Sequence, residues 1–172
     1  MAVNLLQRGT KMSKSIVINP DRCTGCKICE LACSFKHHGE FNPSKSRIKV
    51  NIFPKEAFFY PNVCSQCVEA WCAKICPASA LKRNENTGVI ELQVTKCVGC
   101  KMCMQACPFG VMGFDSEKGI SDKCDLCGGE PECVKYCFYN ALQYKEPEVA
   151  TSHKGRVFAE KLLRSYATEV NR

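Results

Sequence analysis

The chain has 172 residues, a formal net charge of +7 and 16 cysteines. This length suffices for one domain with a core of its own, and a cysteine content of about 9 % is typical of a disulfide scaffold or a metal protein. No apolar run reaches the roughly 18 residues of a membrane helix, and the first twenty residues contain no signal-peptide pattern. We therefore expect a cytoplasmic protein without direct membrane insertion, in which clustered cysteines bind metal rather than form disulfides.

The predicted elements alternate between short strands and cysteine-rich loops along the chain. Each loop ends in a C-x3-C step, which predicts one helical turn with its two cysteines on the same face. We expect a short N-terminal extension over 1–13 and an amphipathic helix in the tail over 148–172. The fold class is therefore predicted to be α+β, with β-prone runs at 15–18, 47–53, 88–94, 110–115 and 141–145.

The cysteines form an internal repeat of four groups, with none left over. Every group opens with C-x2-C and closes with C-x3-C. Groups one and three share the unbroken spacing C-x2-C-x2-C-x3-C, whereas groups two and four have extra residues before their third cysteine. The groups are Cys23, Cys26, Cys29 and Cys33; Cys64, Cys67, Cys72 and Cys76; Cys97, Cys100, Cys103 and Cys107; and Cys124, Cys127, Cys133 and Cys137.

The spacing of the cysteines favours iron–sulfur clusters over zinc. Structural zinc usually takes two separated C-x2-C pairs, whereas C-x2-C-x2-C-x3-C-P is the run of bacterial ferredoxins, whose fourth cysteine ligates the other 4Fe-4S cluster of a pair. "CVGCKMCMQACP" matches this run throughout, and "CTGCKICELAC" matches it without the proline. A structural zinc scaffold remains the alternative metal interpretation.

The positive charge does not indicate nucleic-acid binding, because metal-bound cysteines are thiolates. Four oxidised 4Fe-4S centres with their thiolates contribute about 8−, which brings a formal +7 to about −1. Lysines beside the ligand loops, among them Lys96 and Lys123, would offset the cluster charge or simply be solvated.

Three other residue types near the cysteines are open to two interpretations. Gly25 and Gly99 lie before the second cysteine of their groups, where a missing side chain or a positive φ is expected. Trp71 is interpreted as packing over a cluster rather than as an electron relay. His37 and His38 are interpreted as surface residues, because the cysteines already complete every site.

The full set of runs resembles the four-cluster ferredoxin subunits of molybdenum and tungsten pterin oxidoreductases over residues 14–147. The sequences "KCDLCGGEPECVKYC" and "ALQYKE" are most similar to the small subunits that accompany tungsten aldehyde oxidoreductases and tungsten-dependent benzoyl-CoA reductase. The resemblance implies two ferredoxin-like modules, an outer one from runs 23–33 and 124–137 and an inner one from runs 64–76 and 97–107.

The resemblance also implies how the cysteines share four 4Fe-4S clusters. In this family the first run is paired with the fourth and the second with the third. Phe138 departs from the family pattern, which has proline after the last cysteine. The implied ligand sets are Cys23, Cys26, Cys29 and Cys137; Cys124, Cys127, Cys133 and Cys33; Cys64, Cys67, Cys72 and Cys107; and Cys97, Cys100, Cys103 and Cys76.

The function that the resemblance implies is electron transfer within a hetero-oligomer. The chain has no phosphate-binding or dinucleotide-binding motif and no nucleophile–base arrangement, so we expect no catalytic site of its own. The expected partners are a large tungsten or molybdenum pterin catalytic subunit and a further electron donor or acceptor subunit. A free polyferredoxin shuttle is the alternative, which the apolar "FPKEAFFYP" segment and the predicted tail helix disfavour, since they suggest a docking face.

Overall fold

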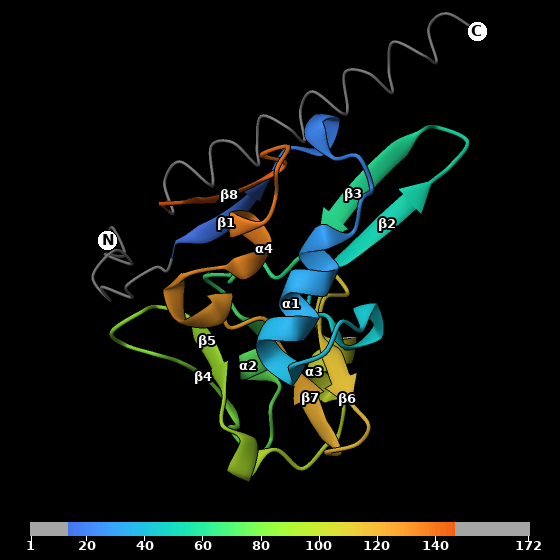
Figure 1. Cartoon of the computed structure of the whole chain (residues 1–172). Coiled ribbons are helices and arrows are strands. Elements are labelled where there is room, and N and C mark those ends of the chain that lie inside the picture. The colour runs from blue at the N-terminus through green and yellow to red at the C-terminus, as the bar shows by residue number, and fades with distance from the viewer. Residues whose placement is uncertain (1–13, 147–172) are drawn as a thin grey trace, which may run out of the picture.

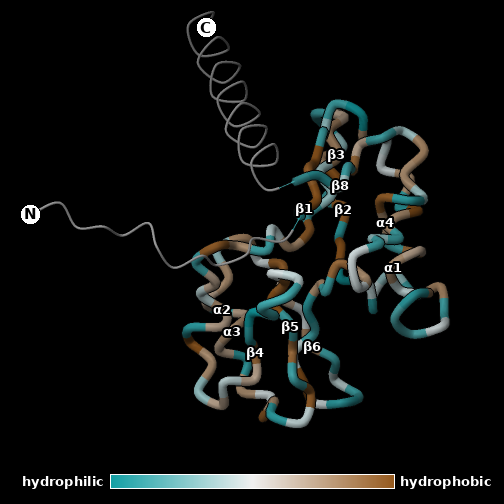
Figure 2. Tube along the Cα trace, turned by 90° about the vertical axis from the view of Figure 1, so that its left-hand side faces the viewer, coloured by the Kyte–Doolittle hydropathy of each residue, from teal (hydrophilic) through white to brown (hydrophobic). Residues whose placement is uncertain are grey.

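The computed structural model describes residues 14–146, which form an α+β fold as predicted. The predicted extension over 1–13 and the predicted tail helix over 148–172 lie outside the described residues. Within residues 14–146, no helix is long and apolar enough to cross a membrane. Figures 1 and 2 show two lobes, one containing β1, β8, β2, β3, α1 and α4, and the other containing α2, α3 and the strands β4 to β6.

Four two-stranded antiparallel sheets frame the cysteine loops. Three are hairpins of consecutive strands, whereas β1 pairs with β8, so that Ser15 lies opposite Lys145 at the two ends of the described chain. The pairs are β1 (Ser15–Ile18) with β8 (Leu142–Lys145), β2 (Lys49–Phe53) with β3 (Phe58–Asn62), β4 (Leu81–Arg83) with β5 (Ile90–Leu92), and β6 (Gly113–Asp115) with β7 (Ile120–Asp122).

Every predicted β-prone run contains a strand, but three strands were not predicted. β3 contains the aromatic run Phe58–Tyr60 and Pro61, while β4 and β7 are three residues long and mostly polar. Each of these three is the hairpin partner of another strand, so pairing rather than its own sequence pattern gives it its conformation. The segment "FPKEAFFYP" therefore forms the turn and second strand of a hairpin.

Each cysteine group supplies one α-helix, and only the first is long. Helix α1 ends at Gly39, whose left-handed conformation (φ +70°) lets its N–H donate to the Phe35 carbonyl at 2.8 Å. The other helices are single turns that end two residues before the closing cysteine of their group. The bounds are α1 (Ile28–His38), α2 (Trp71–Lys74), α3 (Met102–Gln105) and α4 (Glu132–Lys135).

The chain turns in the same way after three of the closing cysteines. Ser79, Gly110 and Asn140 each have a positive φ, and each donates its N–H to the carbonyl of the cysteine three residues earlier. The first group lacks this turn because α1 continues past Cys33. The internal repeat seen in the sequence is therefore also a repeat of backbone conformation.

The core is small and contains many sulfur atoms. Its larger cluster joins aliphatic side chains such as Ile16, Ile48 and Leu142 to five buried cysteines. The smaller cluster lies around Leu81 and Ile90. Cysteine side chains thus occupy positions that aliphatic residues fill in an ordinary domain, so whatever the sulfur atoms bind becomes part of the core. The buried cysteines of the larger cluster are Cys29, Cys33, Cys64, Cys124 and Cys133.

Candidate metal centres

All four cysteine groups bend their first loop in the same way. The residue before the second cysteine has a left-handed backbone in each group, with φ values of +70° at Gly25, +49° at Gln66, +68° at Gly99 and +57° at Leu126. This conformation is expected for glycine and costs about 1 kcal/mol or more for other residues. The prediction for the two glycines is confirmed, and the same bend persists where the residue is not glycine.

Close approach to neighbouring groups is a second reason for glycine at two of these positions. A Cβ atom at Gly99 would lie 2.3 Å from the backbone oxygen of Gly119, and one at Gly25 would lie 2.5 Å from the Phe59 ring. Neither distance is tolerable, since heavy atoms in contact are usually separated by about 3.5–4 Å. These glycines let a hairpin press against each ligand loop.

Three cysteines of the first group meet the last cysteine of the fourth group at one cavity. This cavity has a volume of about 350 Å³ and lies in the lobe that contains α1 and α4, against Val50 and Leu142. The cysteines at its wall are Cys23, Cys26, Cys29 and Cys137.

Two further cavities lie in the lobe that contains α2 and α3. Each is lined by three cysteines of one group and one cysteine of another. One, of about 400 Å³, is lined by Cys64, Cys67, Cys72 and Cys107. The other, of about 300 Å³, is lined by Cys97, Cys100, Cys103 and Cys76. Trp71 lines the first of these cavities with its ring 58 % exposed, so it packs at the rim.

The four remaining cysteines, Cys33, Cys124, Cys127 and Cys133, lie near one another. Burial raises the pKa of Cys133 far above its ordinary value, and the nearby Cys124, Cys33 and Cys127 thiols raise it further. The backbone N–H of Arg47 donates to the Cys33 sulfur at 3.4 Å. The two cysteines of each C-x3-C step therefore lie at different groupings of cysteines.

The buried thiols need a cation in order to ionise. Burial raises the pKa of both Cys29 and Cys124 to about 12, and for Cys29 the neighbouring Glu30 carboxylate adds to the effect. Cys97 is the exception, because backbone N–H groups of Ser121 and Gly99 outweigh its slight burial and lower its pKa. Since metal ligands are thiolates, metal binding at the buried sites must displace protons from these thiols.

Lys123 is the cation that acts on two of the cysteine sets. Burial is the largest influence on the pKa values of both Cys72 and Cys124, and it raises both. The Lys123 ammonium opposes this rise at each thiol, so its charge reaches the sulfur atoms of two different sets. In the sequence this lysine is marked only by its position beside Cys124, because no local pattern predicts its burial.

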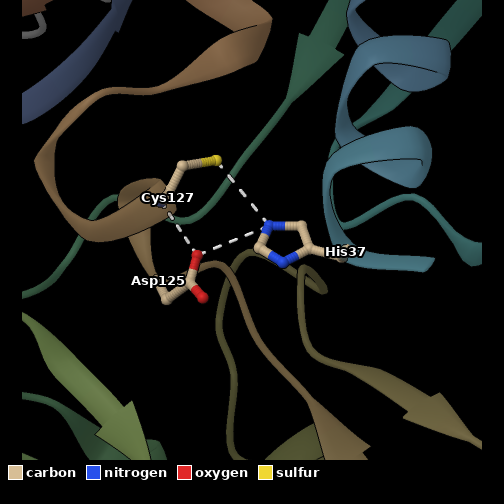
Figure 3. A group of neighbouring side chains, drawn as sticks. All are labelled: His37, Asp125 and Cys127. Carbon is tan, nitrogen blue, oxygen red and sulfur yellow. Dashed lines mark hydrogen bonds and ion pairs between the residues drawn. The ribbon is translucent and has the colours of Figure 1, made fainter. Parts of the chain in front are cut away.

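A polar cluster of His37, Asp125 and Cys127 lies beside the fourth set, as Figure 3 shows. The Nε2 atom of His37 is 3.7 Å from the Cys127 sulfur and 3.5 Å from a carboxylate oxygen of Asp125. The His37 side chain is only 12 % exposed, so its interpretation as a surface residue is wrong. The imidazole is positioned to interact with a cysteine sulfur instead.

Arg47 joins this cluster to the neighbouring hairpin. Its guanidinium donates to Asp122 at 2.6 Å and to Asp125 at 2.9 Å, and it lies 3.3 Å from His37. Although burial acts to raise the pKa of Asp125, the Arg47 charge lowers it below the ordinary value. This network holds α1 and the fourth cysteine group together across more than seventy residues of sequence.

All-sulfur donor sets suit both zinc and iron–sulfur clusters, so the geometry leaves two metal classes. Two family models decide between them: the 4Fe-4S dicluster domain matches residues 55–147, and the 4Fe-4S binding domain matches residues 16–35. The chain belongs to the 4Fe-4S dicluster domain family. It is an iron–sulfur electron-transfer protein, as the cysteine runs predict, and the zinc interpretation is set aside.

Several proteins of known sequence or structure are similar to this member of the 4Fe-4S family. It is 42 % identical over 123 residues to the polyferredoxin-like subunit of an aliphatic sulfonate oxidoreductase from Pyrococcus furiosus, covering 71 % of this chain and 70 % of the relative. It is 35 % identical over 155 residues to the putative electron transport protein YsaA of Escherichia coli, covering 84 % and 98 % of the two chains. A solved structure of the benzoyl-CoA reductase complex BamBC matches 94 % of this chain and 99 % of its own, with 26 % identity and a TM-score of 0.48.

Proposed function

We propose that the chain holds four 4Fe-4S clusters, each bound by three cysteines of one group and the closing cysteine of another. The observation that carries this proposal is the segregation of all sixteen cysteines into four such sets, three of them around separate cavities. The sets are named A (Cys23, Cys26, Cys29, Cys137), B (Cys124, Cys127, Cys133, Cys33), C (Cys64, Cys67, Cys72, Cys107) and D (Cys97, Cys100, Cys103, Cys76).

The four sets would divide between two ferredoxin-like modules. Sets A and B exchange their closing cysteines, Cys33 and Cys137, which ties the outer runs 23–33 and 124–137 into one module. Sets C and D exchange Cys76 and Cys107 in the same way, which ties the inner runs 64–76 and 97–107 into the other. The separation into two lobes supports this division.

The sets would form a row in the order A, B, C, D. The Cys29 thiol of set A acts on the pKa of Cys133 in set B, and the Cys64 thiol of set C acts on the pKa of Cys124 in set B. Cys26 and Cys100, which belong to the two end sets, are exposed, whereas the other cysteines are partly or fully buried. Electrons would therefore enter at one of these ends and leave at the other.

Each bound cluster supplies a one-electron centre, and the chain's own residues determine its surroundings. The buried core around Cys29, Cys124 and Cys133 shields three of the cysteines in sets A and B from water. N–H donors such as the backbone of Arg47 stabilise charge on sulfur. The proposed role of the chain is to relay electrons between its partners.

The proposed partner is the tungsten or molybdenum pterin catalytic subunit of an oxidoreductase, with a further subunit as electron donor or acceptor. Two relatives are named as subunits of oxidoreductases: the polyferredoxin-like subunit of aliphatic sulfonate oxidoreductase and the electron transfer subunit of thiosulfate reductase from Salmonella typhi, which is 35 % identical over 138 residues. Apolar side chains are exposed at both ends of the row, with Phe138 73 % and Val98 70 % exposed. Such side chains suit a fixed subunit interface.

Iron and acid-labile sulfide analysis of the anaerobically purified chain tests the number of clusters. Four 4Fe-4S clusters require about 16 atoms of each element per chain. A value of about 8 would mean that two of the sets are not clusters, and zinc without sulfide would overturn the proposal.

Paired cysteine variants test the exchange of closing cysteines. Cys33→Ser is expected to damage the cluster of set B, whereas Cys29→Ser, four residues earlier on the same helix, is expected to damage set A. Electron paramagnetic resonance of the reduced proteins distinguishes the two losses. Loss of the same cluster in both variants would show that group one encloses a single cluster.

Purification from the native organism distinguishes a fixed subunit from a free shuttle. Co-elution with a large pterin-containing chain through two chromatographic steps at high salt is the expected result. A monomer that carries all the iron and no pterin protein would support the shuttle.

A further inference from the structure

Lys123 is a buried lysine without a carboxylate partner among the described residues. It lies directly after β7, is 5 % exposed, and lines the cavity of set C while being next in sequence to Cys124 of set B. Its ammonium donates to the side-chain oxygen of Gln66 at 3.1 Å and to the Cys124 carbonyl at 2.9 Å. Both acceptors are neutral, so the positive charge has no counter-ion there.

Gln66 is arranged to hold this lysine in place. The Gln66 side chain is itself buried, and its amide donates to the Cys124 carbonyl at 2.8 Å. Its oxygen also accepts from the backbone N–H of Ile90 at 3.1 Å. The polar groups of Gln66 and Cys124 near the ammonium are therefore all engaged in hydrogen bonds. None of them is an anion, and a buried ammonium without an anion is strongly destabilising. The missing anions are expected on the two sides where cysteine sulfurs lie.

Lys96 provides an internal comparison. It precedes Cys97 of set D as Lys123 precedes Cys124 of set B, but Lys96 is exposed. Water screens an exposed charge strongly, whereas a buried one acts at a low effective dielectric constant. Equivalent lysines in the repeat therefore differ in how strongly they affect a neighbouring cluster.

We propose that Lys123 is the shared counter-charge of clusters B and C, and that it raises the reduction potentials of these two clusters above those of A and D. A reduced cluster carries one more negative charge than an oxidised one, so a fixed cation favours the reduced form. Because one ammonium serves both clusters, it also keeps their potentials close together, which suits transfer between the two modules. This inference rests on the proposed placement of four clusters.

A redox titration of the purified chain, followed by electron paramagnetic resonance, tests the role of Lys123. Lys123→Met removes the charge at similar length, Lys123→Arg keeps it, and Lys96→Met is the matched control on the surface. In Lys123→Met we expect two of the four reduction potentials to fall. At a fixed potential, the ratio of reduced to oxidised cluster should decrease about tenfold, which corresponds to a fall of about 59 mV in each reduction potential. Lys123→Arg is expected to retain the wild-type pattern, and Lys96→Met to shift one potential by less.

Three results would overturn the role of Lys123: unchanged potentials in Lys123→Met, equal shifts of all four potentials, or the same shift in Lys123→Arg. Lys123→Met could instead lose iron equivalent to two clusters. If Lys123→Arg retains those two clusters, the result supports the shared charge. If Lys123→Arg loses them as well, the result contradicts it. Wild-type iron content below about 16 atoms per chain would instead contradict the four-cluster proposal itself, which separates the two failures.

Discussion

Cysteine groups one and three have identical spacing but very different helices. In both, the second cysteine follows a glycine with positive φ, and the helix begins after a lysine in the left-handed region, Lys27 or Lys101. Helix α1 then continues for 11 residues, whereas α3 has only four. The ligand loop is therefore a local unit that is independent of the helix that follows it.

The residue after the fourth cysteine is one difference between groups one and three, although α4 is as short as α3 with Phe138 in that place. Pro108 follows Cys107 and cannot donate the N–H that a longer α3 would need. Ser34 follows Cys33, is fully buried, donates its hydroxyl to the Leu31 carbonyl and accepts from the Asn42 N–H. The longer helix lets His37 reach Cys127 of the fourth cysteine group.

The largest expected effect comes from giving group one the proline of group three. Ser34→Pro should break α1 near its middle and cost about 3 kcal/mol or more of stability, with loss of the cluster proposed for set B. Thermal unfolding and iron content measure the effect. Ser34→Ala is the control, since it removes only the hydroxyl bonds, for about 1 kcal/mol. Equal behaviour of the two variants would show that the helix after Cys33 is dispensable.

The two loop glycines should respond differently to substitution. Gly99→Ala pushes a methyl group against the backbone oxygen of Gly119, whereas Gly25→Ala meets the Phe59 ring, which can rotate away. Both variants lose about 1–2 kcal/mol from the positive φ, so the clash makes Gly99→Ala worse. Iron retained after anaerobic gel filtration compares them, and greater loss from Gly25→Ala would reverse the expected order.

Arg47→Met tests the network that joins His37 of α1 and Asp125 of the fourth cysteine group to Asp122 of β7. Removing a partly buried ion-pair partner should cost about 2 kcal/mol. The side chain of Lys45, which pairs with Glu40 and Glu117 in solvent, supplies a control, and we expect no measurable change from Lys45→Met. Thermal unfolding of the two variants gives the comparison, and similar melting temperatures would show that the network does not stabilise the fold.

The difference between wild type and Arg47→Met should also depend on pH. Because Arg47 lowers the pKa of Asp125, this carboxylate stabilises the fold above its unfolded pKa of about 3.9 and loses that contribution as pH falls through the lowered folded value. The stability gap between the two proteins is therefore expected to narrow below about pH 4. Unfolding midpoints in denaturant from pH 3 to 7 measure this difference in stability. A difference that stays constant with pH would show that Asp125 is not the ion-pair partner through which Arg47 stabilises the fold.

The smallest effect is expected from Pro108→Ala. Residue 108 is exposed, and the turn that follows is held by the N–H of Gly110, which donates to the Cys107 carbonyl at 3.2 Å. Stability should change by less than about 1 kcal/mol, with a slight gain in helix content by circular dichroism. A gain as large as the difference between α3 and α1 would mean that the proline alone ends the helix.

The sequence allowed the cysteine groups to be recognised because their spacing recurs and leaves no cysteine unused. It also placed the strands that alternate apolar and polar residues, such as β2. Contacts between residues far apart in the chain could not be predicted from the sequence. Arg47, for example, forms ion pairs with Asp122 and Asp125, which lie 75 and 78 positions later. The burial of Lys123 depends on Gln66, 57 residues away, and no local pattern marks either residue.

The pairing of β1 with β8 has a consequence for biosynthesis. Strand β1 can pair only after β8 has been synthesised. Likewise, Cys23, Cys26 and Cys29 can complete set A only after Cys137 has been synthesised. Sets C and D, by contrast, are complete once residue 107 has left the ribosome. We therefore expect a growing chain to load its middle before its ends, an order that iron incorporation into chains stalled before and after residue 137 would reveal.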